Sequence, residues 1–242
     1  MNTKKQTKTI RKTATTLAIL GGALLTQSAF AAEIDVKITN LTQGIYFTPV
    51  IIAAHTSDAS IYTLGTAASD ELQMMAEGGD ISGLSTVLTA ASADVLENPA
   101  AGVLAPGASA EGSLSTADTN TYLSVASMLL PTNDGFVGLD SWMIPTEAGT
   151  YTVYLNGYDA GTEANDEILN GGGAPGVAGI PADPGAANGT GALGVTDVED
   201  NTMVHVHRGV IGDTDVAGGD SDLDSTVHRW LNPVAMFTVT VK

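Results

Sequence analysis

Hydrophobic and polar residues alternate in two segments near the ends of the chain. In residues 33–39 the apolar side chains Ile34, Val36 and Ile38 occupy every second position, and residues 235–241 show the same alternation. Successive side chains of a strand point to opposite faces, so this pattern predicts strands with one buried face. Five further short segments, rich in β-branched or aromatic residues and bounded by Gly, Pro, Asn or Asp, are residues 46–54, 122–130, 136–143, 151–156 and 203–207.

Two segments have the spacing of helices instead of strands. Residues 69–77 carry two acidic residues in what would be the first turn, apolar residues at helical spacing, and the pair Gly78-Gly79 as a stop. Asp80 can cap a second short helix. The apolar residues that share one face of this second helix are Leu84, Val87 and Leu88. Many short strands with a helical insertion predict an all-β fold, an antiparallel β-sandwich.

One low-complexity segment interrupts the strand pattern. Residues 170–194 contain nine Gly and three Pro and almost no large side chains. Such a segment cannot bury enough apolar surface to order itself, so we expect a long surface loop inserted into a single domain. Residues 189–194 match the dinucleotide-binding string Gly-x-Gly-x-x-Gly, but neither a strand before it nor a helix after it is predicted, and we interpret the match as chance.

The first 31 residues have the organisation of a cleavable secretory signal peptide. The apolar stretch at about residues 17–25 is too short to span a bilayer, and residues 29–31, Ala-Phe-Ala, have the small-x-small pattern of a cleavage site. The basic residues that precede this stretch are Lys4, Lys5, Lys8, Arg11 and Lys12. We therefore expect cleavage after Ala31, export to the periplasm or the extracellular space, and one domain at residues 32–242. No second apolar segment of spanning length follows, so we expect no membrane span.

The net charge and the absence of cysteine exclude several kinds of partner and of functional site. Five of the nine basic residues lie in the predicted signal peptide and none of the 27 acidic residues do, so residues 32–242 hold four basic and 27 acidic residues, a formal charge of −23. A charge of this sign repels nucleic acid and anionic lipid and suits a salty environment or bound divalent cations. The absence of cysteine excludes disulfides, thiolate zinc sites and a cysteine nucleophile.

Acidic residues recur in two segments near the middle of the chain. Residues 133–140 read Asn-Asp-Gly-Phe-Val-Gly-Leu-Asp, and residues 158–163 read Tyr-Asp-Ala-Gly-Thr-Glu. The sequence here resembles the spondin N-terminal domain family of F-spondin, mindin and many bacterial secreted proteins. In animal members a Ser-Pro-Asp-Trp-x-x-Gly segment precedes a Tyr-Asp-Ala-Gly-Thr-Asp segment. Further similarity to bacterial members lies in residues 38–42, 205–209 and 232–235.

Three acidic residues carry the resemblance. Asp134 matches the Asp of the first family segment, and Asp159 and Glu163 match the two acids of the second. Two positions depart from the family pattern, because Gly135 replaces the tryptophan and Glu163 replaces an aspartate. The resemblance implies a C2-like antiparallel β-sandwich that binds one calcium ion through loop carboxylates at one end.

The residues themselves are compatible with this implied site. Calcium takes six to eight oxygen ligands from carboxylates, backbone carbonyls and water. Asp159 and Glu163 can face one ion if Gly161 lets the intervening turn fold tightly, and Asp134 would approach from another loop. The alternative interpretation is that these acids only solvate turns, where Asp-Gly sequences are common.

Two other groups of residues suggest different chemistry. His205 and His207 are two apart and would project to one face of a strand, as zinc or copper ligands or, more commonly, as hydrogen-bonded structural residues. An acidic cluster follows at Asp213, Asp215, Asp220, Asp222 and Asp224. It does not fit an EF-hand, since Ser225 and Leu231 stand where Gly and Glu are needed, and we interpret it as a solvated acidic loop.

The sequence therefore predicts an exported calcium-binding module of the spondin type that acts in binding or adhesion and is not an enzyme. It contains no Gly-x-Ser-x-Gly, His-Glu-x-x-His or P-loop motif. The expected partner is an extracellular or envelope protein or glycan, and the oligomeric state stays open. Two alternatives remain: a metal-dependent hydrolase that uses His205 and His207, and a purely structural envelope protein.

Overall fold

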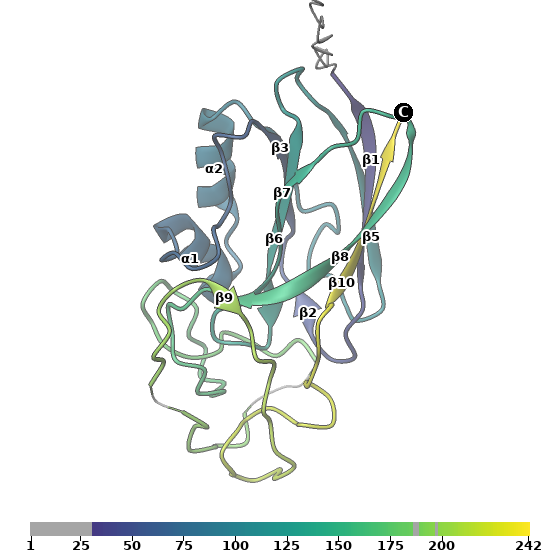
Figure 1. Cartoon of the computed structure of the whole chain (residues 1–242). Helices are drawn as coiled ribbons and strands as arrows, with labels where there is room; N and C mark the ends of the chain where they lie inside the picture. Colours follow the sequence, from purple (N-terminus) through teal and green to yellow (C-terminus); the bar gives the residue numbers. More distant parts are fainter. Residues whose placement is uncertain (1–30, 186–188, 197) are drawn as a thin grey trace, which may run out of the picture.

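The computed structural model describes residues 31–185, 189–196 and 198–242. The predicted signal peptide, except for Ala31, lies outside these residues. Ten strands and two helices follow one another along the described chain (Figure 1). In chain order they are β1 (Glu33–Asn40), β2 (Tyr46–Phe47), β3 (Ile51–His55), α1 (Asp70–Gly78), α2 (Ser82–Ala90), β4 (Asp94–Glu97), β5 (Ser109–Ser115), β6 (Tyr122–Leu130), β7 (Gly135–Met143), β8 (Gly149–Asp159), β9 (His205–Val206) and β10 (Ala235–Val241).

The strands form an antiparallel β-sandwich in which one strand belongs to both layers. The strand order is β4-β3-β6-β7-β8-β10-β1-β5, with β2 paired to β6 and β9 paired to β8. Residues 149–155 of β8 pair with β10, whereas residues 156–159 pair with β7. Figure 1 shows β8 running obliquely from one layer to the other. The predicted all-β sandwich is confirmed.

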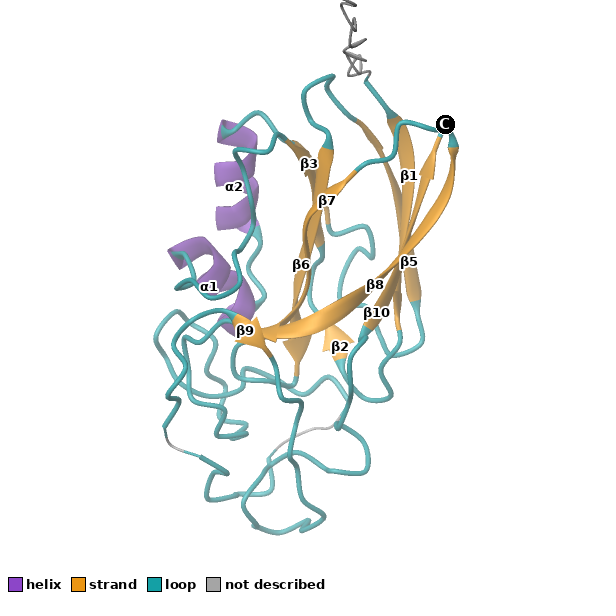
Figure 2. Ribbon diagram, viewed as in Figure 1, coloured by secondary structure: helices purple, strands orange, loops and turns teal. Residues whose placement is uncertain are grey.

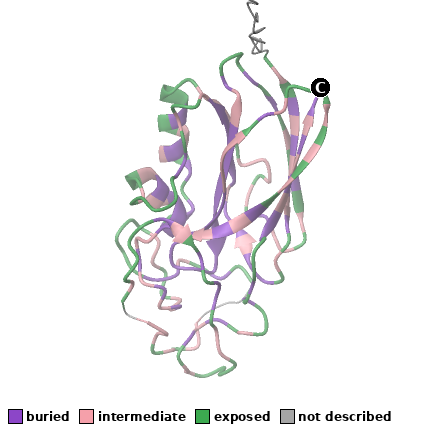
Figure 3. Ribbon diagram, viewed as in Figure 1, coloured by how far each residue is buried: buried purple, intermediate pink, exposed green. Residues whose placement is uncertain are grey.

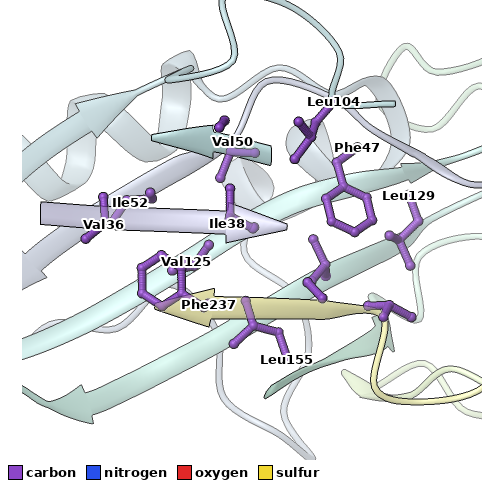
Figure 4. Packing of buried hydrophobic residues seen from close by; sticks show 14 of the residues in the cluster. Val36, Ile38, Phe47, Val50, Ile52, Leu104, Val125, Leu129, Leu155 and Phe237 are labelled. Carbon is purple, nitrogen blue, oxygen red and sulfur yellow. The ribbon is translucent and has the colours of Figure 1, made fainter. Parts of the chain in front are cut away.

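Alternating apolar residues build the core between the layers. Ile34, Val36 and Ile38 of β1 are almost completely buried, and Phe237 and Val239 of the paired strand β10 lie in the same cluster (Figures 3 and 4). The outward residues of these strands are polar except for Met236 of β10. The period-two pattern that predicted the first and last strands therefore corresponds to one face in the core and one face in solvent.

The two predicted helices cover the outer face of the layer that contains β3 and β6 (Figure 2). Ser69 caps α1 by accepting the N–H of Leu72, and Gly79 ends the helix with φ +71°. The Asp80 carboxylate accepts the N–H of Ser82 at 2.8 Å, although Ile81 is the residue that directly precedes α2. Val87 is 44% exposed, so the buried face of α2 consists of Leu84 and Leu88.

Several predicted boundaries differ from the structure for local reasons. The segment 46–54 is two strands, β2 and β3, because Pro49 lies between them and cannot donate to a ladder. The segment 203–207 is a strand only at His205–Val206. The sequence pattern missed β4 and β5. In β5 the inward residues are small except for Leu114, which weakens the alternation.

The Gly-rich segment is irregular, as predicted, but it is anchored to the domain. Ile180 is fully buried and bridges to Leu169, and it lies in the main core cluster. Figure 1 shows the long loops that follow β8 and β9 gathered at the end of the sandwich opposite the C-terminus. None of the helices in the described residues is long and apolar enough to cross a membrane.

Candidate functional site

Asp134 and Asp159 lie together at the end of the β7–β8 pair. Gly135, the first residue of β7, pairs with Asp159, the last residue of β8, and the N–H of Ala160 donates to the Asp134 carbonyl at 3.2 Å. Both acidic residues are buried, with 0% and 1% of their surface exposed. Antiparallel pairing thus brings together two carboxylates that are 25 positions apart in the sequence.

The turn after β8 wraps around the Asp134 carboxylate. Asp134 Oδ2 accepts the N–H of Thr162 at 2.7 Å and the N–H of Glu163 at 3.2 Å. Gly161 makes this turn with φ +70°, and a Cβ there would lie 2.6 Å from the carbonyl carbon of Thr202. The tight turn at Gly161 is confirmed. The other oxygen, Asp134 Oδ1, is buried and has no hydrogen-bond partner within the described residues.

The Asp159 carboxylate is held by neutral donors. Its Oδ1 accepts the N–H of Gly161 and its Oδ2 accepts the Asn165 side-chain amide, each at 2.8 Å. Two histidines approach the same carboxylate: His205 Nδ1 lies 3.8 Å from Oδ1, and His207 Nε2 lies 4.0 Å from Oδ2. Asp159 therefore lies next to Asp134 without a lysine or arginine partner among the described ion pairs.

Ionising the acids at this end of the sandwich costs free energy, because they are buried and no lysine or arginine among the described ion pairs balances their charge. Burial, and then the charge of Asp159, raises the pKa of Asp134 to about 7. Burial also raises the pKa of Asp159, against the hydrogen bond from Asn165. The negative charges at this position are thus only partly compensated.

The Glu163 side chain points toward the Gly-rich segment. Its Oε2 accepts the N–H of Gly179 at 3.0 Å, and its buried Oε1 has no partner in the part of the chain that the structure describes. Burial raises the pKa of Glu163 to about 7, opposed by the Gly179 N–H and reinforced by the charge of Glu77. The backbone of Glu163 therefore contacts Asp134, whereas its carboxylate lies near a different set of groups.

The described residues have some, but not all, of the features of a calcium site. Across residues 31–185, 189–196 and 198–242 no group of three or more His, Asp or Glu side chains is already arranged to hold a metal ion. The unpartnered oxygens Asp134 Oδ1 and Glu163 Oε1 are buried hard donors, and Asp159 supplies further carboxylate oxygens close to Asp134. Carboxylate oxygens are the donors that a hard divalent cation prefers, and the Asp134–Asp159 pair is the part of this set that lies together, so an ion there would complete its shell with backbone carbonyls or water.

His205 lies on β9 and His207 follows it directly. The hydrogen bonds of each ring show which of its nitrogens carries the proton. His205 Nδ1 lies 2.9 Å from the carbonyl of Met203 and is therefore protonated. His207 Nδ1 accepts the N–H of Gly209 at 2.9 Å, so the neutral ring carries its proton on Nε2. Burial lowers the pKa of His207 to about 3, which keeps it neutral. His207 Nε2 thus carries the ring proton, lies 4.0 Å from Asp159 Oδ2 and has no hydrogen-bond partner within the described residues, so it does not offer a lone pair to a metal.

The later acidic cluster is better ordered than a solvated loop. Asp222 Oδ1 accepts the backbone N–H groups of Thr190, Gly191 and Ala192 at 2.6, 3.0 and 3.2 Å, and its Oδ2 accepts the N–H of Leu169 at 2.7 Å. Burial works in the opposite direction, but these bonds hold the pKa of Asp222 below its usual range. We interpreted the match of this segment to the dinucleotide-binding motif as chance. Its backbone N–H groups bind a carboxylate of its own chain.

Two further buried acids anchor loops in the same way, and sequence reasoning missed both. Glu167 accepts the N–H groups of Ile211 and Gly212 at 2.6 and 2.8 Å. Glu77, at the end of α1, accepts the N–H of Gly176 at 2.9 Å. The only sequence signal for them is the shortage of lysine and arginine, which leaves backbone N–H groups as the available donors.

The fold and this site define an all-β sandwich module with a cluster of buried carboxylates at its loop end. The sequence profile described as Spondin_N matches residues 36–167 of the chain. The chain belongs to the spondin N-terminal domain family. The matched region contains Asp134, Asp159 and Glu163 and ends before the Gly-rich segment. A comparison with curated proteins found no match.

Proposed function

We propose that this spondin-type domain is a calcium-stabilised, non-enzymatic binding module that acts outside the cytoplasm. The observation that carries the proposal is the burial of Asp134 beside Asp159, with an unpartnered Asp134 carboxylate oxygen and with no lysine or arginine partner among the described ion pairs. A buried charge needs a partner, and a divalent cation is the partner that an all-oxygen donor set selects.

Asp134 and Asp159 would hold the ion, with Glu163 as the third acidic residue. When bound, calcium supplies the positive charge that these carboxylates lack. The rest of the arrangement belongs to the protein: Gly161 allows the turn, and Thr162 and Glu163 fix the Asp134 carboxylate through their N–H groups. The Gly179 contact of Glu163 would couple the ion to the Gly-rich segment. Calcium would then order the loops that gather at this end of the sandwich.

Binding or adhesion is the role that best fits this chemistry. The anchored loops present backbone and small side chains at one end of a rigid sandwich, which is the arrangement of many recognition modules. The strongly acidic composition argues against nucleic acid as a partner. We expect an extracellular or envelope protein or glycan, in keeping with the signal-peptide-like first 31 residues.

The alternative of a histidine-dependent hydrolase has less support. A neutral histidine whose Nδ1 accepts a hydrogen bond carries its proton on Nε2, so His207 can ligate a metal only if the Gly209 contact breaks. The fourth histidine, His228, lies elsewhere, because its Nε2 is 3.2 Å from Asp183 Oδ2 and its Nδ1 accepts the N–H of Asp224.

A thermal melt after chelation, repeated with calcium, magnesium and zinc, tests the proposal. Ligand at one hundred times its Kd stabilises the native state by about 2.7 kcal/mol, so calcium should raise Tm by roughly 5–10 °C. Magnesium should act more weakly, since it requires stricter octahedral geometry. No response to calcium, or a response to zinc alone, would overturn the proposal and favour the histidine site.

A further inference from the structure

The two layers of the sandwich diverge at a fork between β7 and β8. Pairing between these strands reaches only from Gly135↔Asp159 to Gly138↔Asn156. Beyond that point β7 continues along β6, while β8 continues along β10 (Figure 1). A pocket of about 370 Å³ lies at this fork, and we call it the fork pocket. Its lining includes Tyr62, Leu64, Asp140, Tyr154, Asn156 and Tyr158.

Three of the six tyrosines of the chain line the fork pocket. Tyr154 and Tyr158 stand on the same face of β8 because they are four positions apart, and Tyr154 is 60% exposed. The rings of Tyr62 and Tyr158 are in contact, with centroids 5.2 Å apart at 46°. Gly138 permits this arrangement, since a Cβ there would lie 2.7 Å from the Tyr62 hydroxyl. The pocket therefore has an aromatic wall in which Tyr154 and Tyr158 stand on β8, while Tyr62, which is 6% exposed, packs behind them from the segment between β3 and α1.

Asp140 gives the same pocket a negative charge. It lies on β7 beyond the last pair with β8, and Ser124 Oγ lies 3.4 Å from its Oδ1. Partial burial raises the pKa of Asp140, against hydrogen bonds from Ser141, Ile61 and Ser124 and the nearby His55. No lysine or arginine is among the described residues that line the pocket. Of the basic residues in the described chain, Lys37 and Lys242 pair with Glu111 and Asp35.

We propose that the fork pocket binds the cationic side chain of an arginine- or lysine-bearing segment of a partner protein. Tyrosine faces attract a cation through the negative charge of the ring face, and Asp140 supplies a carboxylate for a charge-assisted hydrogen bond. Leu64, which is 53% exposed, provides apolar surface for the aliphatic stem. The charge of −23 on residues 32–242 attracts such a basic segment over a longer range.

Charge complementarity favours this occupant over a glycan. A neutral sugar could stack on Tyr154 and bond to Asn156, but it would bring no positive charge to Asp140. The inference rests on the binding-module part of the proposed function and not on the calcium site. Asp134, Asp159 and Glu163 do not line the fork pocket.

Titration with blocked peptides by calorimetry and by amide chemical-shift mapping tests the proposal. The probes are tri-arginine, its neutral isostere tri-citrulline, and methyl glucoside, each in calcium-containing buffer at low and moderate salt. We expect tri-arginine to bind, to shift amides of β7 and β8 around the fork, and to weaken with salt, whereas tri-citrulline should not bind. Asp140→Asn and Tyr154→Ala should each lower the tri-arginine affinity by about tenfold.

A matched control separates a specific pocket from general attraction to an acidic protein. Asp58→Asn removes one exposed carboxylate that does not line the fork pocket and should leave the affinity unchanged. Equal losses in Asp58→Asn and Asp140→Asn would overturn the proposal, as would equal binding of tri-citrulline. Binding of methyl glucoside without tri-arginine would assign the pocket to a glycan instead. Calcium melts on the same samples keep the two proposals distinct, since failure here leaves the calcium response unaffected.

Discussion

Asp134 and Asp159 are buried side by side because the first residue of β7 pairs with the last residue of β8. Each carboxylate accepts hydrogen bonds from N–H groups of the turn that follows β8, yet Asp134 Oδ1 has no partner in the described chain. Neutral donors orient these acids without cancelling their charge. The uncompensated negative charge of the two carboxylates is the physical basis for the proposed cation and for the first two predictions.

Without a cation, the stability of the protein should fall as pH rises toward neutrality. The pKa values of Asp134 and Glu163 are raised to about 7 in the folded state, above the ~4 of an unfolded carboxyl. Their contribution to stability is therefore present below about pH 4 and is lost as pH rises through about 7. We expect the chelated protein to lose about 2–4 kcal/mol between pH 5 and 7.5, measured by urea unfolding.

Calcium should remove this loss, since a bound cation favours the ionised carboxylates. Asp134→Asn should also reduce the pH dependence of the chelated protein, because the amide cannot ionise. A chelated wild-type protein that is equally stable at pH 5 and 7.5 would show that these carboxyls are not under electrostatic stress.

The three acids should contribute unequally to calcium-dependent stabilisation. We expect Asp134→Asn and Asp159→Asn to abolish the increase in Tm with calcium, because these two carboxylates lie together. Glu163→Gln should reduce it only partly, since the Glu163 carboxylate also binds the Gly179 N–H. His205→Ala is the control and should keep the full increase. An increase that survives Asp159→Asn would place the ion elsewhere.

The Asp222 carboxylate should hold the Gly-rich segment in place. Asp222→Ala removes the acceptor of four backbone N–H groups, and the expected loss is about 2–4 kcal/mol in local stability. Hydrogen exchange at Thr190 and Ala192, together with limited proteolysis, measures the effect. Asp215→Ala is the matched control, because within the described residues the Asp215 carboxylate accepts a single N–H, that of Ala217 at 3.1 Å. Equal protection in both variants would contradict the anchoring role.

The strands with strong alternation were predictable from sequence, and the loop anchors were not. β1 and β10 have one face in the core, so a period of two identifies them. β5 has small residues at its inward positions and lacks this signal. Asp134 and Asp159 were found through the family resemblance. Glu167 and Asp222 make most of their bonds to backbone N–H groups, which every residue type except proline offers, so no side-chain pattern marks them.

Gly138→Ala should disturb the aromatic wall of the fork pocket. A Cβ at this position would lie 2.7 Å from the Tyr62 hydroxyl and must displace the ring, at a cost of about 1–3 kcal/mol. Gly149→Ala is the control on β8, where the nearest atom would be the Tyr151 hydroxyl at 3.5 Å, an ordinary contact. Urea unfolding of both variants measures the difference. A loss no larger in Gly138→Ala than in Gly149→Ala would show that the Tyr62 ring moves freely.

His207 should remain neutral far below the pH at which an ordinary histidine gains a proton. Burial lowers its pKa to about 3 in the folded state, whereas an unfolded histidine titrates near 6.5. The stability that this residue contributes is therefore present above about pH 6.5 and is lost as pH falls toward 3, because the unfolded chain binds the proton first. With calcium present to suppress the titration of the carboxyls, wild-type protein should lose more stability between pH 7 and 4.5 than His207→Gln, which has no ring to protonate.

Nitrogen NMR of the His207 ring should show the proton on Nε2 throughout this range. A ring that becomes doubly protonated near pH 6 would contradict the assignment and would reopen His207 as a titratable group at the end of the sandwich.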